Sequence, residues 1–253
     1  MNKSLAFVGC EKEIEQLHSL HALGKHVLIV GGAGIGKTAL LRQVRQCCPL
    51  LICEETSSLG RICDSLELQL GWACCKLNVV ERKNRLLLYL QRRGEPVAFD
   101  HAFHAPPRVA RFIAQLSEQI PIWIACRSDR PKEIGHVWQN LYNFTRFEIS
   151  PLAAVETRKL IQQAAAEGKI QTDACKHIGE LHRMSEGNPR ILEQLLSELA
   201  SREYKMDSSF GLDLLDLDRR IHEVDLAVKE AGEDGVRFSF PSPSSHSRGG
   251  KNE

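Results

Sequence analysis

The chain has 253 residues, of which 43% are hydrophobic and 26% charged, and its net charge at pH 7 is +1. This composition is that of an ordinary globular protein, long enough for one large domain or for one domain plus a small one. The near-neutral balance excludes a global field that would draw the protein to nucleic acid or to membranes. No apolar run approaches the roughly 20 residues that span a bilayer, and the start is too soon interrupted for a secretory signal. We therefore expect a cytoplasmic protein.

The first two-thirds of the chain alternate short apolar runs with helical patterns, which is typical of a parallel α/β sheet. Strands are predicted at 27–30, 50–53, 96–99, 122–126 and 144–149. Helices are predicted between them at 38–47, 59–70, 80–92 and 108–119. Because the strands read as continuous apolar runs, we expect helices on both faces of the sheet, in a domain over 1–150.

After Ser150-Pro151 only helical patterns remain, which predicts a small helical lid domain over 151–203. Thr172 is placed to cap its second helix, and Gly187 suits the left-handed position that ends that helix. Asn188 and Pro189 then form the N-cap and first position of a third helix. The predicted apolar face of the first helix consists of Val155, Leu160, Ile161 and Ala164.

The C-terminal part is predicted to be a helix over 204–230 followed by a disordered tail over 231–253. Helical spacing relates the apolar residues Leu214, Leu217, Ile221, Val224 and Val228. Such a stripe suits docking on the chain's own domain or on a partner, and both alternatives stay open.

The nine cysteines show no C-x-x-C spacing, although Cys47-Cys48 and Cys74-Cys75 are adjacent pairs. Several of them lie in apolar runs, where a reduced thiol acts as a small hydrophobic group. We expect reduced thiols rather than a metal or redox site.

A phosphate-binding loop follows the first predicted strand, because residues 31–38 match the pattern G-x-x-x-x-G-K-[ST]. Glycines allow the backbone amides to converge on phosphate oxygens, and the following helix points its positive end at the anion. Lys37 would reach the β- and γ-phosphates, and Thr38 would offer a hydroxyl to Mg²⁺. The predicted nucleotide contacts are Gly31, Gly32, Ala33, Gly34, Ile35, Gly36, Lys37, Thr38 and Ala39.

A phosphate loop requires a carboxylate for the magnesium shell, and Asp100 ends the strand at 96–99. We take Asp100 to be the one acid that ends an apolar strand at a plausible distance after the loop. The next position, where hydrolytic members of this fold carry a water-polarising Glu, is His101. Either His101 or the nearby His104 is a candidate catalytic base.

With these segments the chain resembles AAA+ and STAND-type ATPases, especially origin-recognition ATPase modules, over about residues 5–202. The carrying segments are Phe7–Glu13, the phosphate loop, Val97–Asp100, Ile122–Ser128, Ile149–Leu152 and Gly187–Arg190. The resemblance implies a three-layer P-loop NTPase fold of the ASCE/AAA+ type, with strand order 5-1-4-3-2. It also implies that Phe7, Val8 and Gly9 lie against the adenine.

The same resemblance implies two phosphate sensors, Arg127 after a strand and Arg190 in the first turn of a lid helix. A guanidinium suits phosphate because of its planar fork. An arginine finger from a neighbouring subunit would be Arg130 or Arg146, with no ground for choosing between them. A homo-oligomer or another protein partner is therefore expected.

The leading hypothesis is an ATPase that binds ATP with Mg²⁺ and hydrolyses it to drive a conformational switch. One alternative is a weakly hydrolysing or non-hydrolysing switch that recruits a partner, which His101 motivates. A DNA-associated helper follows from the resemblance alone, and the turn at 187–190 disfavours a small-molecule kinase. Because no guanine-reading N-K-x-D motif occurs, ATP is favoured over GTP.

Overall fold

The computed structural model describes residues 9–72, 77–170 and 172–200, together with Leu217, Arg220, Ile221, Val224, Asp225 and Val228. The chain divides into two compact units, Met1–Glu203 and Tyr204–Glu253, and the following concerns the first. The predictions made for Phe7, Val8, Leu214 and the tail over 231–253 lie outside the described residues. So do Cys74 and Cys75.

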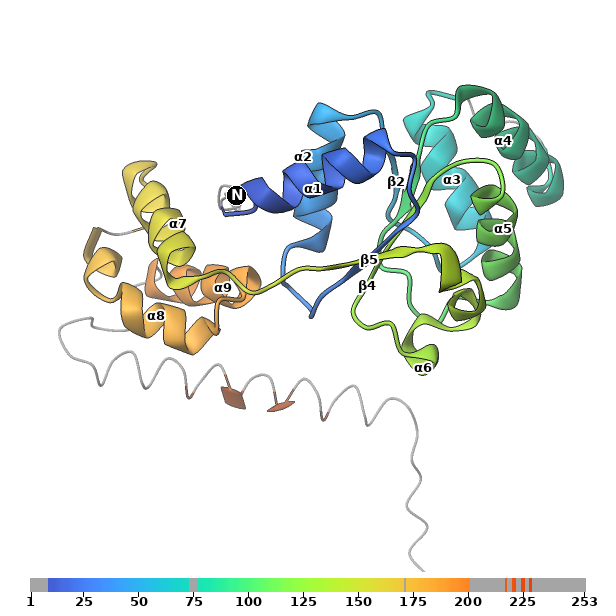
Figure 1. The fold of residues 1–253 in the computed structure, drawn as a ribbon. Helices are drawn as coiled ribbons and strands as arrows, with labels where there is room; N and C mark the ends of the chain where they lie inside the picture. Colours follow the sequence, from blue (N-terminus) through green and yellow to red (C-terminus); the bar gives the residue numbers. More distant parts are fainter. Residues whose placement is uncertain are drawn as a thin grey trace, which may run out of the picture. The chain divides into compact units, whose positions relative to one another are not determined.

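A five-stranded parallel sheet forms the centre of the first unit (Figure 1). Its strands are β1 (Val27–Val30), β2 (Leu51–Cys53), β3 (Val97–Phe99), β4 (Ile122–Cys126) and β5 (Thr145–Glu148). The spatial order is β2-β3-β4-β1-β5, which confirms the predicted order 5-1-4-3-2. Because all pairings are parallel, the carboxyl ends of the strands meet at one edge of the sheet.

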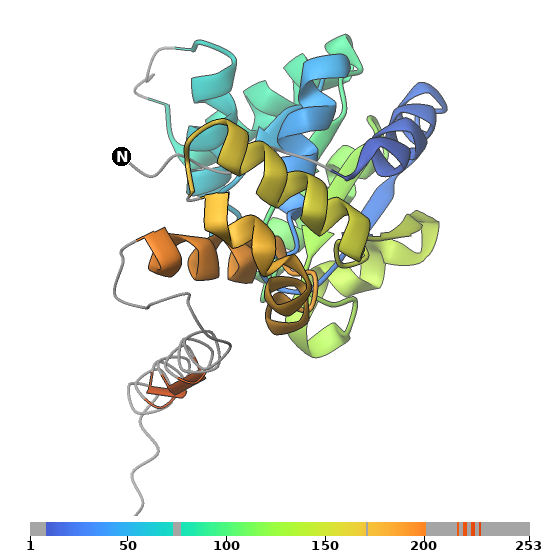
Figure 2. The same cartoon turned by 90° about the vertical axis from the view of Figure 1, so that its left-hand side faces the viewer.

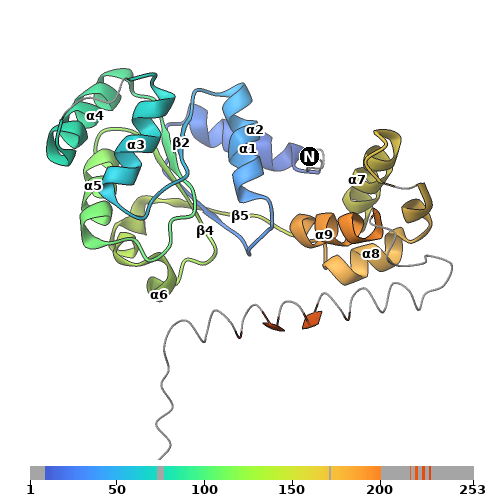
Figure 3. The ribbon, with the colours of Figure 1, turned by 180° about the vertical axis from the view of Figure 1, so that it is seen from behind.

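Helices cover both faces of this sheet, as the continuous apolar strands predicted (Figure 3). On one face lie α1 (Glu11–Ala22) and α2 (Lys37–Cys47), and on the other α3 (Leu59–Gln69), α4 (Val79–Arg93) and α5 (Pro107–Ser117). Successive strand residues point to opposite faces. Leu28 and Val30 of β1 accordingly pack with α3–α5, whereas Val27 and Ile29 pack with α1 and α2.

Local signals account for several helix ends. Asn78 and Glu81 form a reciprocal capping box at the start of α4, and Gly94, with φ of 65°, takes the left-handed position after it. Pro107 stands at the first position of α5. A short helix, α6 (Pro131–Ile134), and a 3₁₀ segment, η1 (His136–Asn143), connect β4 to β5. No helix within the described residues is both long and apolar enough to cross a membrane.

The chain after β5 is helical, with α7 (Ala154–Ala166), the 3₁₀ segment η2 (Thr172–Lys176), α8 (Ile178–Ser185) and α9 (Pro189–Ala200) (Figure 2). Leu160, Ile161 and Ala164 are buried as predicted, but Val155 is 65% exposed. The expectation for Val155 was wrong because five helical positions separate it from Leu160, a rotation of about 140° around the axis.

The prediction that Thr172 caps the second helix was also wrong. Thr172 opens η2, and α8 begins only after His177. The intervening 3₁₀ turn places Ala174 in the core of this helical part, where it is 1% exposed. The spacing of Ile178 and Leu181 does not reveal this separate short turn.

The turn between α8 and α9 agrees with its sequence. Gly187 has φ of +71°, and a Cβ there would lie 2.3 Å from the carbonyl oxygen of Leu152. Only glycine fits here, because a Cβ would collide with that oxygen. Any other residue would also be strained at this φ. The Asn188 side chain accepts a hydrogen bond from the Arg190 backbone N–H at 3.1 Å, which confirms Asn188 as the N-cap.

Candidate functional site

The phosphate loop joins β1 to α2 at the carboxyl edge of the sheet. Gly34 and Gly36 have φ of 77° and 102°, and Gly36 is the N-cap of α2. A Cβ at Gly31 would lie 2.8 Å from Ile35, and one at Gly34 would lie 2.7 Å from Arg190. Three of the predicted glycines are thus required by conformation or space, whereas Gly32 has nothing within 4 Å of its Cβ position.

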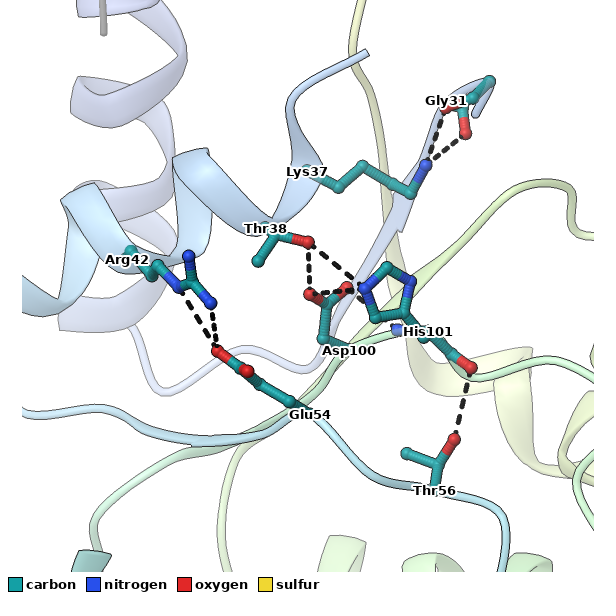
Figure 4. Close-up of polar contacts among 9 residues, drawn as sticks. Gly31, Lys37, Thr38, Arg42, Glu54, Thr56, Asp100 and His101 are labelled. Carbon is teal, nitrogen blue, oxygen red and sulfur yellow. Dashed lines mark hydrogen bonds and ion pairs between the residues drawn. The ribbon is translucent and has the colours of Figure 1, made fainter. Parts of the chain in front are cut away.

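Lys37 lies inside the loop and is only 7% exposed. Its Nζ donates to the carbonyl oxygens of Gly31 at 2.6 Å and Gly32 at 2.8 Å (Figure 4). Burial lowers the pKa of Lys37, the charge of Asp100 opposes this shift, and Arg127 adds to it. The ammonium group of Lys37 therefore lies inside the loop that is predicted to bind phosphate.

Thr38 and Asp100 meet at the end of β3, although 62 positions separate them in sequence. The Thr38 hydroxyl donates to Asp100 Oδ2 at 2.5 Å, and the carboxylate is fully buried. Its Oδ1 accepts the backbone N–H of His101 at 2.8 Å. A hydroxyl and a carboxylate oxygen side by side fit Mg²⁺, which prefers oxygen ligands and keeps several waters. When bound, Mg²⁺ would neutralise phosphate charge at this position.

The described residues contain no cluster of three or more His, Cys, Asp or Glu side chains arranged to hold a metal. Thr38 and Asp100 would consequently hold Mg²⁺ together with phosphate oxygens and water. The buried cysteines of the sheet and α3 are free thiols. Burial raises the pKa of Cys53, Cys63 and Cys126 to about 11, so they stay protonated at neutral pH.

Of the two candidate histidines, His101 is the one beside Thr38 and Asp100. Its Nε2 lies 3.5 Å from both Thr38 Oγ1 and Asp100 Oδ2 (Figure 4). His104 instead packs its ring against Phe103, with 5.4 Å between the ring centres. Both histidines have left-handed backbone, with φ of 52° and 49°, which is uncommon for residues other than glycine.

The two predicted sensor arginines lie near the phosphate loop from different elements. Arg127 follows β4, stacks over Phe103 at 5.6 Å, and is near enough to Lys37 to lower its pKa. Arg190 is the second residue of α9; its backbone N–H donates to the carbonyl oxygen of Gly34 at 3.3 Å, and its side chain packs on that glycine. Asn188 Nδ2 donates to the carbonyl oxygen of Ala33 at 2.9 Å.

Three other described residues have predicted roles: Gly9, Arg130 and Arg146. Of the three predicted adenine contacts, Gly9 is the one that the structure describes. It has φ of 89°, and its Cα faces Glu156 of α7. Arg146, one of the finger candidates, is paired with Asp129 at 3.0 Å and Glu148 at 2.8 Å. Arg130 precedes α6, and its side chain is exposed. The choice between the two arginines stays open.

Sequence reasoning missed one acid at this edge. Glu54 directly follows β2 and is a second acid, besides Asp100, at the end of an apolar strand. Arg42 of α2 donates to Glu54 Oε1 from Nη2 at 2.7 Å and from Nε at 3.2 Å. The signal was present, because an acid after a parallel strand lies at the shared carboxyl edge.

A hollow of about 470 Å³ lies beside His101, between the loops that follow β2 and β3. The Thr56 hydroxyl, donating to the His101 carbonyl oxygen at 3.2 Å, joins these two loops. The residues lining the hollow are Glu54, Glu55, Thr56, Ser57, His101, Phe103 and His104.

The strand order, the phosphate loop and the acid at the end of β3 together define a P-loop NTPase fold. No family model and no curated protein matches the sequence. Solved structures do match the fold. The Walker-type ATPase PABY2304 of Pyrococcus abyssi is 16% identical with a TM-score of 0.63, over 92% of this chain and 77% of that one.

Two further similar structures are origin-recognition proteins. Cdc6p of Pyrobaculum aerophilum is 17% identical with a TM-score of 0.60, and the match covers 79% of this chain and 62% of the Cdc6p chain. The ORC1 protein of Aeropyrum pernix, solved in complex with DNA, is 16% identical with a TM-score of 0.60. That match covers 84% of this chain and 66% of the ORC1 chain. The chain thus spans less than two thirds of these two proteins. At such identities the likeness describes the fold, which is that of origin-recognition-like ATPase modules.

Proposed function

We propose that this chain binds ATP with Mg²⁺ and hydrolyses it to switch the position of the helical part α7–α9. The observation that carries the proposal is the contact between the start of α9 and the phosphate loop. Asn188 bonds to Ala33, and Arg190 bonds to and packs on Gly34. A γ-phosphate bound in that loop would lie within reach of the first turn of α9, which couples nucleotide state to helix position.

The proposed roles follow from the groups at the edge of the sheet. Lys37 binds the β- and γ-phosphates, and Thr38 and Asp100 hold Mg²⁺. Arg127, after β4, and Arg190, on α9, contact the γ-phosphate from different elements and stabilise charge that develops there. ATP is the proposed nucleotide because the sequence carries no guanine-reading motif. Self-association, a protein partner and association with DNA remain predictions.

One observation favours a second candidate function, an ATP-holding switch with little turnover. His101 stands where hydrolytic relatives carry a Glu, and its ring faces the two metal ligands. Under this alternative, ATP binding would still move α7–α9, but phosphate release would stay slow until a partner completed the site.

The test combines ATP affinity, steady-state phosphate release and amide exchange of α9 in the presence of Mg²⁺. Wild type should bind ATP, release phosphate and show slower exchange in the first turn of α9 when ATP is bound. Lys37→Ala removes a charge-assisted contact, so affinity should fall by roughly 10- to 100-fold and turnover should disappear. Arg190→Ala should lose the change in α9 exchange while retaining most ATP binding.

Arg158→Ala is the matched control, because Arg158 is an exposed arginine of the same helical part, on α7. It should behave as wild type in all three measurements. ATP binding and an α9 response without Lys37-dependent turnover would select the holding switch. Absence of ATP binding by wild type would refute both candidate functions.

A further inference from the structure

Thr38 and Asp100 are the proposed metal ligands, so another group must activate the attacking water. His101 Nε2 lies 3.5 Å from both Thr38 Oγ1 and Asp100 Oδ2, so its ring faces the Mg²⁺ position. His104 is turned to Phe103. Resting on the proposed hydrolysis, we infer that Glu54 is the catalytic carboxylate that orients and deprotonates the water.

Strand pairing places Glu54 next to the metal acid. β2 and β3 are parallel neighbours with Cys53 opposite Phe99, and the Asp100 backbone N–H donates to the Cys53 carbonyl oxygen at 2.8 Å. Glu54 and Asp100 therefore leave adjacent strands at the same level, about 4.8 Å apart in the pairing direction. One carboxylate at this edge can bind the metal while the other activates the water.

Arg42 holds the Glu54 side chain in place. Arg42 lies one helical turn after Thr38 on α2, and both of its bonds go to Oε1 of Glu54 (Figure 4). Among the described residues, no hydrogen bond engages the second oxygen, Oε2. The guanidinium thus restrains the carboxylate and leaves one oxygen to accept a proton from water.

Glu54 lines the hollow of about 470 Å³ beside His101, and we expect water to reach this oxygen from there. A water needs only about 30 Å³, so several fit there. Glu54 and His101 line the same hollow from its two loops. The hydrogen bond between Thr56 and His101 fixes the spacing of these loops.

The reaction balances with these groups alone. The water oxygen forms a bond to the γ-phosphorus while the bond from that phosphorus to the β–γ bridging oxygen breaks, and its electron pair stays on ADP. One water proton passes to Glu54 Oε2 and from there to solvent or the departing phosphate. No oxidant, reductant or co-reactant is required.

Glu55 lines the same hollow but has no ion pair with Arg42, so it serves as the matched control. We expect Glu54→Gln to lower kcat for phosphate release by at least about 100-fold, the usual contribution of a general base. Its ATP affinity should stay within about twofold and its melting temperature should be unchanged, because glutamine still accepts from Arg42. Glu55→Gln should keep wild-type kcat.

Arg42→Ala should reduce kcat about tenfold, as expected of a group that only positions another. Arg42→Lys should recover part of that loss. Wild-type turnover in Glu54→Gln would overturn the assignment while leaving the proposed function intact, and so would a loss of turnover in Glu55→Gln. Weakened ATP binding or a lowered melting temperature in Glu54→Gln would show a structural role and also overturn it. Wild type without Lys37-dependent turnover would refute the proposed hydrolysis and this inference with it.

Discussion

The phosphate loop and the edge of the sheet beyond it are built in contrasting ways. The loop is one contiguous segment whose conformation depends on Gly34 and Gly36 and whose cation, Lys37, bonds to its own carbonyls. The edge beyond is assembled from β2, β3 and β4, which contribute Glu54, Asp100 and Arg127. The loop therefore depends on local backbone geometry, and the edge depends on strand order.

Replacing Asp100 by Asn should give the largest effect on the assembled edge. The amide keeps the shape of Asp100 but loses the charge of this fully buried acid, so Mg²⁺ binding should weaken. We expect phosphate release to fall by roughly 100-fold or more at fixed Mg²⁺, with partial recovery as Mg²⁺ is raised. Turnover measured against Mg²⁺ concentration checks this prediction.

The control is Asp129→Asn, which changes an exposed acid just after β4 that pairs with Arg146. It should leave the Mg²⁺ dependence of turnover unchanged. Equal losses in the two variants would show that general surface charge, rather than a metal ligand, governs the edge.

Gly34→Ala should produce an intermediate effect that reports on the contiguous loop. The residue has φ of 77°, and an added Cβ would lie 2.7 Å from the Arg190 Cβ. We expect a loss of about 1–2 kcal/mol in the free energy of unfolding and roughly tenfold weaker ATP binding. Chemical denaturation and ATP titration measure the two quantities.

Gly32→Ala is the matched change in the same loop, since nothing lies within 4 Å of its Cβ position. Stability should change by less than about 0.5 kcal/mol. If Gly32→Ala were as harmful as Gly34→Ala, the loop would depend on general flexibility rather than on the contact with Arg190.

Arg127→Ala should have the smallest effect of the three. Its guanidinium is exposed and stacks on Phe103, so removing it should lower kcat about three- to tenfold and leave stability almost unchanged. Steady-state kinetics would detect this loss. Arg130→Ala, three residues later, should keep wild-type kcat in the isolated chain; a loss there and none in Arg127→Ala would reverse the sensor assignment.

Sequence reasoning was accurate where the determinants are local. The motif at 31–38 predicted a strand, a loop and a helix, and β1 and β4 have the predicted bounds. Asn188 and Pro189 begin α9 because cap chemistry operates within a few residues. The strand order came from resemblance, since apolar runs alone do not specify which strands pair.

The errors arose where tertiary packing decides. Thr172 was assigned to the wrong helix because a separate 3₁₀ turn, which carries the buried Ala174, precedes α8. Glu54 was overlooked although the predicted order already paired the second strand with the third, which brings the residues that follow them together. The pairing of Arg42 with Glu54 likewise joins a helix to a strand end, and no local spacing predicts it.

The two bonds from Lys37 to the carbonyl oxygens of Gly31 and Gly32 occupy two of the three N–H donors of its ammonium group. An anion can therefore use the third donor directly, and each carbonyl bond that it displaces costs about 0.5–1.5 kcal/mol. Under the proposed function, a triphosphate in the loop would meet more backbone N–H groups than a single phosphate ion would. We therefore expect the loop to bind a triphosphate more tightly than free phosphate.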